Sequence, residues 1–144
     1  MRGCVLGIDY GSRRIGLAVS DPDRVFAFPA GCLERRGGDK DLAALHELAR
    51  ARDVVEIVVG LPIHMDGREG PEARAARAFA EALGRETDLR VHLFDERWTS
   101  REAERALRET GGRRRARGEV DAAAATLLLR AWLERRARGV EGER

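Results

Sequence analysis

The stretch Cys4-Val-Leu-Gly-Ile-Asp9 decides the fold of this protein. Its apolar residues follow one another almost without a break, as they do in a strand that is buried on both faces of a sheet, and the run ends in a carboxylate. Two further short apolar runs follow at residues 15–19 and 25–28, separated by the turn-forming residues Ser20-Asp-Pro-Asp23. Because no helical pattern lies between these three runs, we predict that they pair as an antiparallel meander.

Beyond residue 38 the apolar residues recur alternately with the helical and the extended period. Helices are predicted from Asp39 or Asp41 to about Arg52, over residues 71–85, after the capping box formed by Thr99 and Glu102, and from about Glu119 to Arg138. Strands are predicted over residues 54–59 and 91–94. The order β-β-β-α-β-α-β-α-α favours an α/β fold with one five-stranded mixed sheet flanked by helices. We expect a single domain over residues 1–138 and a frayed tail over residues 139–144.

The composition argues against a secreted or membrane protein. The strongest apolar runs, at residues 54–59 and 127–129, are far shorter than the ~20 residues that a membrane-spanning helix needs. Cys4 and Cys32 are too few for a disulfide framework and lack the spacing of metal ligands. We therefore expect a protein of the cytoplasm that has no membrane contact. The net charge of +2 does not by itself indicate a nucleic-acid partner, so the distribution of the charges matters more.

Three acidic positions stand where core residues would be expected. Asp9 ends the first strand, Asp95-Glu96 follows the strand over residues 91–94, and Asp121 lies on the core-facing stripe of the last helix. The residues that define this stripe are Ala124, Ala125, Leu128 and Trp132. Ligands of open α/β sheets collect beyond the carboxyl ends of the strands, so these carboxylates are expected to share one crevice and to need a cation. Oxygen ligands without a His or Cys cluster favour Mg²⁺ or Mn²⁺, which serve phosphoryl-transfer chemistry.

Each acid also has an ordinary structural explanation. Asp9 is typical of a turn, Asp95 or Glu96 of a salt bridge with Arg97, and Asp121 of a helix N-cap. The register of the strand is unknown, so its alternation does not decide whether Asp95 or Glu96 points to the crevice. The three histidines are scattered along the chain and are assigned to no metal site.

Arginine accounts for nearly all of the positive charge, since Lys40 is the one lysine among 27 basic residues. A cluster lies between glycines just before the last helix, and its members are Arg113, Arg114, Arg115 and Arg117. Like charges repel and glycines resist a fixed structure, so a mobile loop is predicted there. Together with Arg14 and Arg97, these arginines are expected to guide a phosphate backbone, because a guanidinium donates two parallel hydrogen bonds to phosphate.

Four motifs, taken together, resemble one known family. They are Gly7-Ile-Asp-Tyr-Gly-Ser-Arg-Arg-Ile-Gly-Leu-Ala-Val-Ser-Asp21, Val59-Gly-Leu-Pro62 with Met65-Asp-Gly67, Asp95-Glu-Arg97, and Val120-Asp-Ala-Ala-Ala124. In this order, and over about nine-tenths of the chain, they resemble the bacterial YqgF-type pre-16S rRNA nucleases, which are also described as Holliday-junction resolvases. The resemblance implies an RNase H-like fold and a metal-dependent phosphodiester nuclease.

For the site, the resemblance implies that Asp9, Glu96 and Asp121 are the catalytic acids and the ligands of one or two Mg²⁺ or Mn²⁺ ions. Asp95 is then left to orient Arg97 or a neighbouring backbone group, a task that metal sites commonly need. The expected substrate is precursor 16S rRNA, processed at its 5′ end, or a four-way DNA junction, and the protein is expected to be a monomer or a homodimer. Related junction resolvases carry a second acid one turn into the final helix, where this chain has Ala124.

Two other classes of function remain open from the sequence. Asp9-x-Gly11 with Gly16 also resembles the phosphate loop of actin-like sugar kinases and ATPases, but those proteins need two lobes around the nucleotide and this chain has room for one. A non-catalytic nucleic-acid-binding module would explain the arginines without requiring three acids. Metal-dependent cleavage separates this module from a nuclease, whereas ATP turnover would support the kinase-like class.

Overall fold

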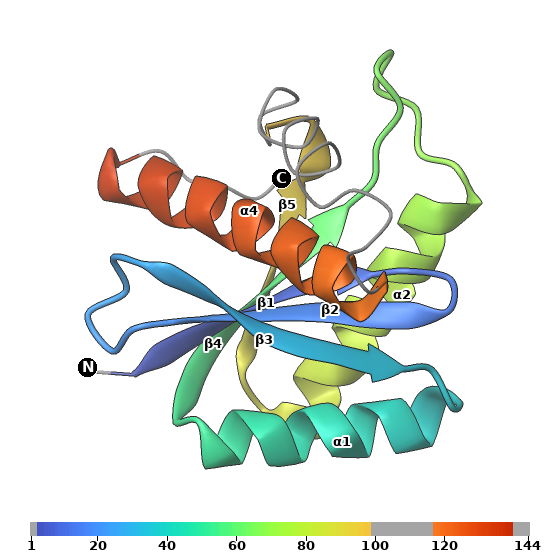
Figure 1. The fold of residues 1–144 in the computed structure, drawn as a ribbon. Coiled ribbons are helices and arrows are strands. Elements are labelled where there is room, and N and C mark those ends of the chain that lie inside the picture. The colour runs from blue at the N-terminus through green and yellow to red at the C-terminus, as the bar shows by residue number, and fades with distance from the viewer. Residues whose placement is uncertain (1–2, 99–116, 140–144) are drawn as a thin grey trace.

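The computed structural model describes residues 3–98 and 117–139, which form a sheet with helices on both faces (Figure 1). Its strands are β1 (Cys4–Tyr10), β2 (Arg14–Ser20), β3 (Ala27–Glu34), β4 (Val54–Leu61) and β5 (Arg90–Asp95). They lie in the order β3-β2-β1-β4-β5. The pairs β1–β2 and β2–β3 are antiparallel, and the pairs β1–β4 and β4–β5 are parallel. The predicted five-stranded mixed sheet is therefore confirmed, and the carboxyl ends of β1, β4 and β5 share one edge.

The helices divide between the two faces of the sheet. In Figure 1, α1 (Gly38–Ala51) and α2 (Pro71–Thr87) lie below the sheet, and α4 (Arg117–Ala137) crosses above it. The short 3-10 helix η1 (Glu96–Trp98) directly follows β5. These helices begin and end close to their predicted bounds, whereas the helix predicted after Thr99 lies outside the described residues, as do residues 140–144. No helix within the described parts is long and apolar enough to cross a membrane.

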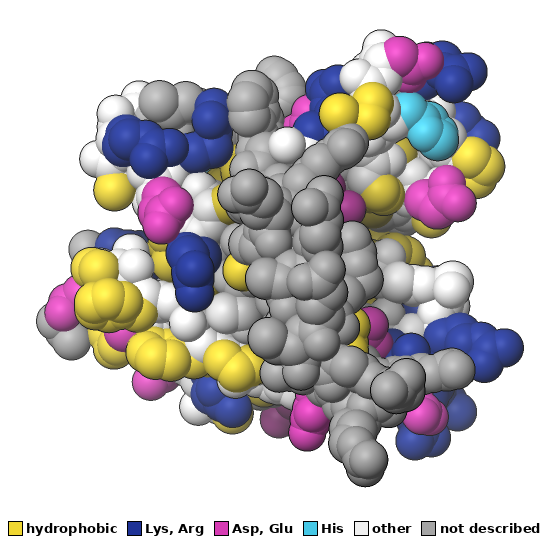
Figure 2. All heavy atoms as spheres, turned by 45° about the horizontal axis from the view of Figure 1, so that its top comes forward, with side chains coloured by type: hydrophobic (Ala, Val, Ile, Leu, Met, Phe, Trp, Pro, Cys, Tyr) yellow, Lys and Arg dark blue, Asp and Glu magenta, His cyan; other side chains and the backbone are white. Residues whose placement is uncertain are grey.

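The third strand differs from its prediction. It runs over Ala27–Glu34, not over residues 25–28, so Val25 and Phe26 lie outside it. The reason is Asp21, whose Oδ1 atom accepts hydrogen bonds from the backbone N–H groups of Val25 and Phe26, each at 2.8 Å, and holds both residues in the turn. Hydrophobic side chains consequently gather on the side of the β2–β3 turn, at the left of Figure 2, and Phe26 is 63% exposed.

Alternation along the strands sends each side chain to one of two cores. In β1, Leu6 and Ile8 face α1 and α2, while Val5 packs beneath α4. Gly7 also faces α4, since a Cβ atom on it would lie 2.9 Å from the Cβ atom of Leu129. Small residues on this face therefore let α4 lie close to the sheet.

Candidate active site

Asp9 lies at the carboxyl end of β1 and belongs to the face that α4 covers. Val5 and Gly7 face α4, and with the period of two along a strand Asp9 faces it as well. Its antiparallel partner in β2 is Gly16. On the other side of β1, Ile8 pairs with Val59 of β4, so Asp9 and Gly60 come next along the two parallel strands. Asp9 is thus flanked by a glycine on each neighbouring strand.

Asp121 lies over the first of these glycines. A Cβ atom on Gly16 would overlap the backbone carbonyl oxygen of Asp121 and lie 3.2 Å from its Cβ atom, so α4 touches β2 at this point. The Oδ2 atom of Asp121 accepts a hydrogen bond of 2.6 Å from Nε of Arg14, the first residue of β2. This bond raises the pKa of Arg14 above its ordinary value. Because Asp121 is the fifth residue of α4, the interpretation of Asp121 as a helix N-cap is wrong.

Glu96 lies over the second glycine. A Cβ atom on Gly60 would lie 2.6 Å from the Oε2 atom of Glu96 and 3.1 Å from the Cδ2 atom of Leu128 in α4. The carboxylate of Glu96 is therefore on the α4 side of β4, beside the end of β1. Three acids from β1, η1 and α4 gather at one edge of the sheet, where the carboxyl ends of the parallel strands meet.

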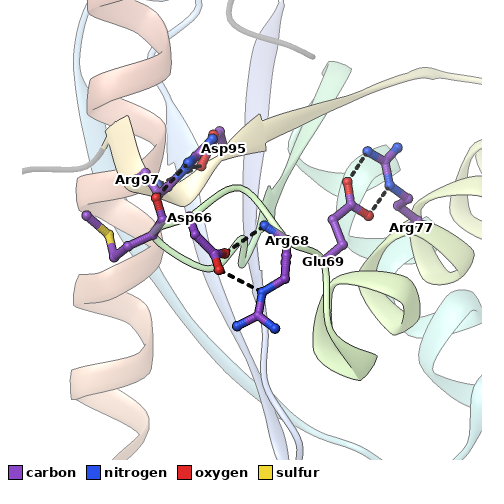
Figure 3. Close-up of polar contacts among 7 residues, drawn as sticks. Asp66, Arg68, Glu69, Arg77, Asp95 and Arg97 are labelled. Carbon is purple, nitrogen blue, oxygen red and sulfur yellow. Dashed lines mark hydrogen bonds and ion pairs between the residues drawn. The ribbon is translucent and has the colours of Figure 1, made fainter.

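Asp95, the neighbour of Glu96, is turned to a different partner. It is 8% exposed, and its carboxylate accepts hydrogen bonds from the backbone N–H group and the guanidinium of Arg97, the shortest at 2.7 Å (Figure 3). Burial alone would raise the pKa of Asp95, but the hydrogen bonds and the positive charge of Arg97 outweigh it and lower that pKa. The salt bridge expected for one of the two acids is therefore made by Asp95.

The loop between β4 and α2 is fastened to this ion pair. Arg97 donates a hydrogen bond from Nη1 to the backbone carbonyl of Met65 at 3.3 Å. At the base of the loop, Glu69 forms two hydrogen bonds with Arg77 of α2, at 2.8 and 2.7 Å (Figure 3). The tip, which carries the 66% exposed Met65, is thereby held beside η1, the helix that begins with Glu96.

Comparison with known proteins assigns the chain to a family. The model of the RuvX family, described as Holliday junction resolvase, matches residues 3–135. This chain belongs to the RuvX family. A relative from Anaeromyxobacter dehalogenans strain 2CP-C is 51% identical over 133 residues, which cover 92% of this chain and 97% of the relative. One from Koribacter versatilis is 45% identical and covers 99% of this chain and 93% of its own length. Both carry the name "Putative pre-16S rRNA nuclease".

The fold has a counterpart among solved structures. Thermus thermophilus RuvC in complex with a Holliday junction substrate superposes with a TM-score of 0.64 at 15% identity, covering 97% of this chain and 99% of that one. Thermus thermophilus RuvC in a second structure gives a TM-score of 0.61 over 96% of this chain. The expected RNase H-like fold of this RuvX family member is therefore confirmed.

The donor chemistry of the three acids fits a divalent metal. Asp9, Glu96 and Asp121 offer carboxylate oxygens alone, the donor type that Mg²⁺ and Mn²⁺ prefer. Within residues 3–98 and 117–139 no group of three or more His, Cys, Asp or Glu side chains is arranged as a metal cage. The Oδ2 atom of Asp121 is instead directed to Arg14. Metal ligation by these acids therefore stays a prediction for this RuvX protein.

The predicted nucleic-acid contacts are described only in part. Arg14 and Arg97 each pair with an acid of the site region. Arg113, Arg114 and Arg115 lie outside the described residues, and of Arg117 the structure describes only the backbone, as the first residue of α4. Sequence reasoning passed over further exposed arginines at the end of the sheet that carries the β1–β2 turn, where basic side chains gather at the right of Figure 2. They are Arg13, Arg35 and Arg36.

Sequence reasoning also missed the two glycines on which the acids lie. Gly16 and Gly60 both stand inside strands, where glycine costs stability unless another group approaches the backbone closely. Gly16 lies inside the predicted strand over residues 15–19, so it was an available signal for the close approach that Asp121 makes. Gly60 gave no such signal, because the strand predicted over residues 54–59 ended before it, whereas β4 runs to Leu61.

Proposed function

We propose that this member of the RuvX family is a metal-dependent nuclease that hydrolyses a phosphodiester bond of RNA or DNA. One observation carries the proposal: Glu96 lies over Gly60 and Asp121 over Gly16, and these two glycines flank Asp9 at the carboxyl edge of the sheet. Such an edge is where α/β folds bind ligands. Three carboxylates together repel one another, and a divalent cation offsets that repulsion.

In the proposed site, Asp9, Glu96 and Asp121 hold one or two Mg²⁺ or Mn²⁺ ions. When bound, the metal supplies an activated water and positive charge for the departing 3′ oxygen, which leaves a 5′ phosphate on the product. Arg97 binds the phosphate backbone beside the scissile bond. Asp95 fixes the direction of the Arg97 guanidinium through hydrogen bonds as short as 2.7 Å, a positioning task that leaves Glu96 for the metal.

Arginines also bind the backbone on the other side of the site. Arg14 lies next to Asp121, and Arg113, Arg114, Arg115 and Arg117 precede it in the chain. Guanidinium groups bind phosphate oxygens bidentately and carry no sequence preference, so they orient the strand without selecting its bases. Selection of the substrate then depends on the shape of the nucleic acid.

The names of the relatives and of the family suggest two substrates. We propose that the 5′ end of precursor 16S rRNA is the natural target, because the relatives at 45–51% identity carry that name. A four-way DNA junction is the second candidate, from the family description. Both occur in the bacterial cytoplasm, the compartment we propose. Symmetric cleavage of a junction would require a homodimer, whereas trimming of an RNA end needs only a monomer built on one catalytic domain over residues 1–138.

A cleavage assay tests the proposal and ranks the substrates. Precursor 16S rRNA and a four-way junction of matched length are each incubated with the purified protein in Mg²⁺, in Mn²⁺ and in EDTA. Metal-dependent cuts that leave 5′ phosphates are expected for the wild type and not for Glu96→Gln. Binding of both nucleic acids without cleavage in either metal would favour the non-catalytic module, and ATP turnover would favour the kinase-like class.

Metal binding is tested separately through thermal unfolding. A metal that binds the native state raises the melting temperature by mass action. We expect Mn²⁺ to raise the Tm of the wild type and to have little effect on Asp121→Ala. Equal shifts in the two proteins would show that Asp121 does not take part in metal binding.

A further inference from the structure

The ion pair between Arg14 and Asp121 joins two of the proposed functional groups to each other. Nε of Arg14 lies 2.6 Å from Oδ2 of Asp121, and the two residues are 107 positions apart in the chain. Their side chains are 23% and 27% exposed, so water and ligands reach both. A proposed metal ligand is thus already occupied by a cation that belongs to the protein.

A divalent metal and Arg14 compete for the same carboxylate. A guanidinium that donates to a carboxylate oxygen occupies one of its lone pairs, and its positive charge repels a metal ion that arrives a few ångströms away. Asp121 can give both oxygens to a metal without this competition only if Arg14 moves.

The guanidinium of Arg14 can also bind a ligand that competes with Asp121 for it. Within the described residues, Nε is the one atom of its guanidinium that has a partner, while Nη1 and Nη2 make no hydrogen bond to the protein. A guanidinium offers five donors arranged as a planar fork. Among the described residues, two of its nitrogen atoms are therefore left to bind a ligand, and a phosphate diester is the anion that this fork fits best in a nuclease.

We infer that Arg14 is exchanged between Asp121 and the phosphate backbone of the substrate, so that nucleic acid must bind before Asp121 is fully available to the metal. This inference rests on the proposed function, since it assumes that Asp121 is a metal ligand. Without substrate, Arg14 neutralises Asp121 and keeps the metal weakly bound. With substrate, the phosphate takes Arg14 and the affinity for metal rises.

Thermodynamic linkage makes the coupling reciprocal. If nucleic acid raises the affinity for Mn²⁺ by some factor, Mn²⁺ raises the affinity for nucleic acid by the same factor. Through this coupling, the protein would bind its metal tightly, and become able to hydrolyse, only after it has bound a substrate.

The experiment measures Mn²⁺ affinity directly, from the electron paramagnetic resonance signal of free Mn²⁺ during a titration. The full-length wild type is compared with Arg14→Gln, with Arg14→Lys, which keeps the charge, and with Arg13→Gln, which removes the same charge one residue away on the exposed turn. Each protein is titrated alone and with a short phosphorothioate RNA, whose integrity is checked on a gel afterwards. Far-UV circular dichroism confirms that each variant is folded.

Without RNA, we expect Arg14→Gln to bind Mn²⁺ about tenfold more tightly than the wild type, equivalent to about 1.4 kcal/mol. Arg13→Gln and Arg14→Lys are expected to change the affinity less than about twofold, because the first leaves the ion pair intact and the second retains a cation beside Asp121. RNA should tighten Mn²⁺ binding in the wild type and much less in Arg14→Gln. In the Asp121→Asn background the Arg14→Gln change should have no further effect.

The contrary results are distinct. Weaker or unchanged Mn²⁺ binding by Arg14→Gln would overturn the exchange and make Arg14 a fixed support that orients Asp121. If Arg13→Gln gained as much Mn²⁺ affinity as Arg14→Gln, general surface charge would explain the effect, and the proposed exchange of Arg14 would also be overturned. Wild-type Mn²⁺ affinity in Asp121→Asn would instead refute the proposed metal site itself.

Discussion

The backbone carbonyl oxygen of Asp121 lies in the space that the Cβ atom of a side chain at Gly16 would fill. This contact fixes how closely the start of α4 approaches β2, and with it the height of the Asp121 carboxylate above the end of the sheet. The obstacle is a main-chain atom of a helix, which cannot swing aside as a side chain can. Residue 16 therefore controls the position of a proposed metal ligand through packing alone.

We predict that Gly16→Ala lowers the free energy of unfolding by about 1–3 kcal/mol, because α4 must shift to make room for the methyl group. The shift also displaces Asp121, so the Mn²⁺-induced rise in Tm should fall by more than half. Chemical denaturation and thermal unfolding measure the two effects. Gly38→Ala is the matched control, since a Cβ atom at position 38 meets nothing within 4 Å and should leave stability unchanged or slightly improved. Unchanged stability in Gly16→Ala would contradict the contact.

The sequence predicted the elements of the fold better than their relations in space. Helices and strands with a clear apolar period, such as α2 and β4, were found because burial of one face is a local property of the pattern. The start of β3 was misplaced because the side chain of Asp21, which caps the turn, does not appear in a hydrophobic pattern. The meander and the mixed sheet followed from the order of the elements.

The site was predicted in composition but not in geometry. Asp9, the pair Asp95-Glu96 and Asp121 stood out as acids in apolar surroundings, and that signal is local, whereas the choice of Glu96 came from the family resemblance. Whether Asp95 or Glu96 points to the site depends on the register of β5 and on η1, and neither can be read from alternation. The bond between Arg14 and Asp121 joins residues 107 positions apart, and such a pairing follows only from the assembled fold.

Arg97→Gln should destabilise the protein in a pH-dependent way. The pKa of Asp95 is lowered because the hydrogen bonds and charge of Arg97 outweigh its burial, so the pair contributes stability above the unfolded pKa of about 3.9. This contribution is lost as the pH falls through the lower folded pKa. At every pH between 5 and 8, we expect the Tm of Arg97→Gln to lie several degrees below that of the wild type. Below about pH 4 the difference in Tm between the two proteins should disappear.

Arg68→Gln serves as the control for this series. Arg68 pairs with Asp66 on the same loop, but the two side chains are 78% and 56% exposed, and exposed pairs contribute little. Its Tm should follow that of the wild type at every pH. A constant difference between Arg97→Gln and the wild type down to pH 3 would show that ionised Asp95 is not the cause.

Glu56 offers a test of stability that is separate from the active site. It lies on the α4 face of β4, where it accepts hydrogen bonds from Arg136 at 2.6 Å and from His92 at 3.1 Å. Glu56→Ala should lower the free energy of unfolding by about 1–3 kcal/mol, because it removes the carboxylate that accepts the hydrogen bonds of His92 and Arg136. The Mn²⁺-induced Tm shift should remain that of the wild type. A lost metal response would mean that the two ends of α4 are coupled.

The arginine cluster at residues 113–117 should contribute to the salt dependence of binding. If Arg113, Arg114, Arg115 and Arg117 each contact a duplex phosphate, counterion release predicts a slope contribution near −3.6, or a loss of roughly 150-fold in affinity between 50 and 200 mM salt. Replacement of all four by Ser should weaken binding and flatten the slope while the metal-induced Tm shift stays intact. Fluorescence anisotropy measures the affinity of both proteins for nucleic acid at each salt concentration. Unchanged affinity at every salt concentration would make the cluster a solvated linker.

The most direct measurement is the single-turnover cleavage rate of Asp9→Asn beside that of the wild type, in Mg²⁺ and on whichever substrate the wild type cuts. The variant keeps the size of the side chain and removes one of the clustered charges, so the metal-free protein should be as stable as the wild type or more stable. We predict that cleavage falls to the background seen in EDTA while the variant stays folded. Cleavage by folded Asp9→Asn at the wild-type rate would contradict the three-acid metal site at the carboxyl edge of the sheet.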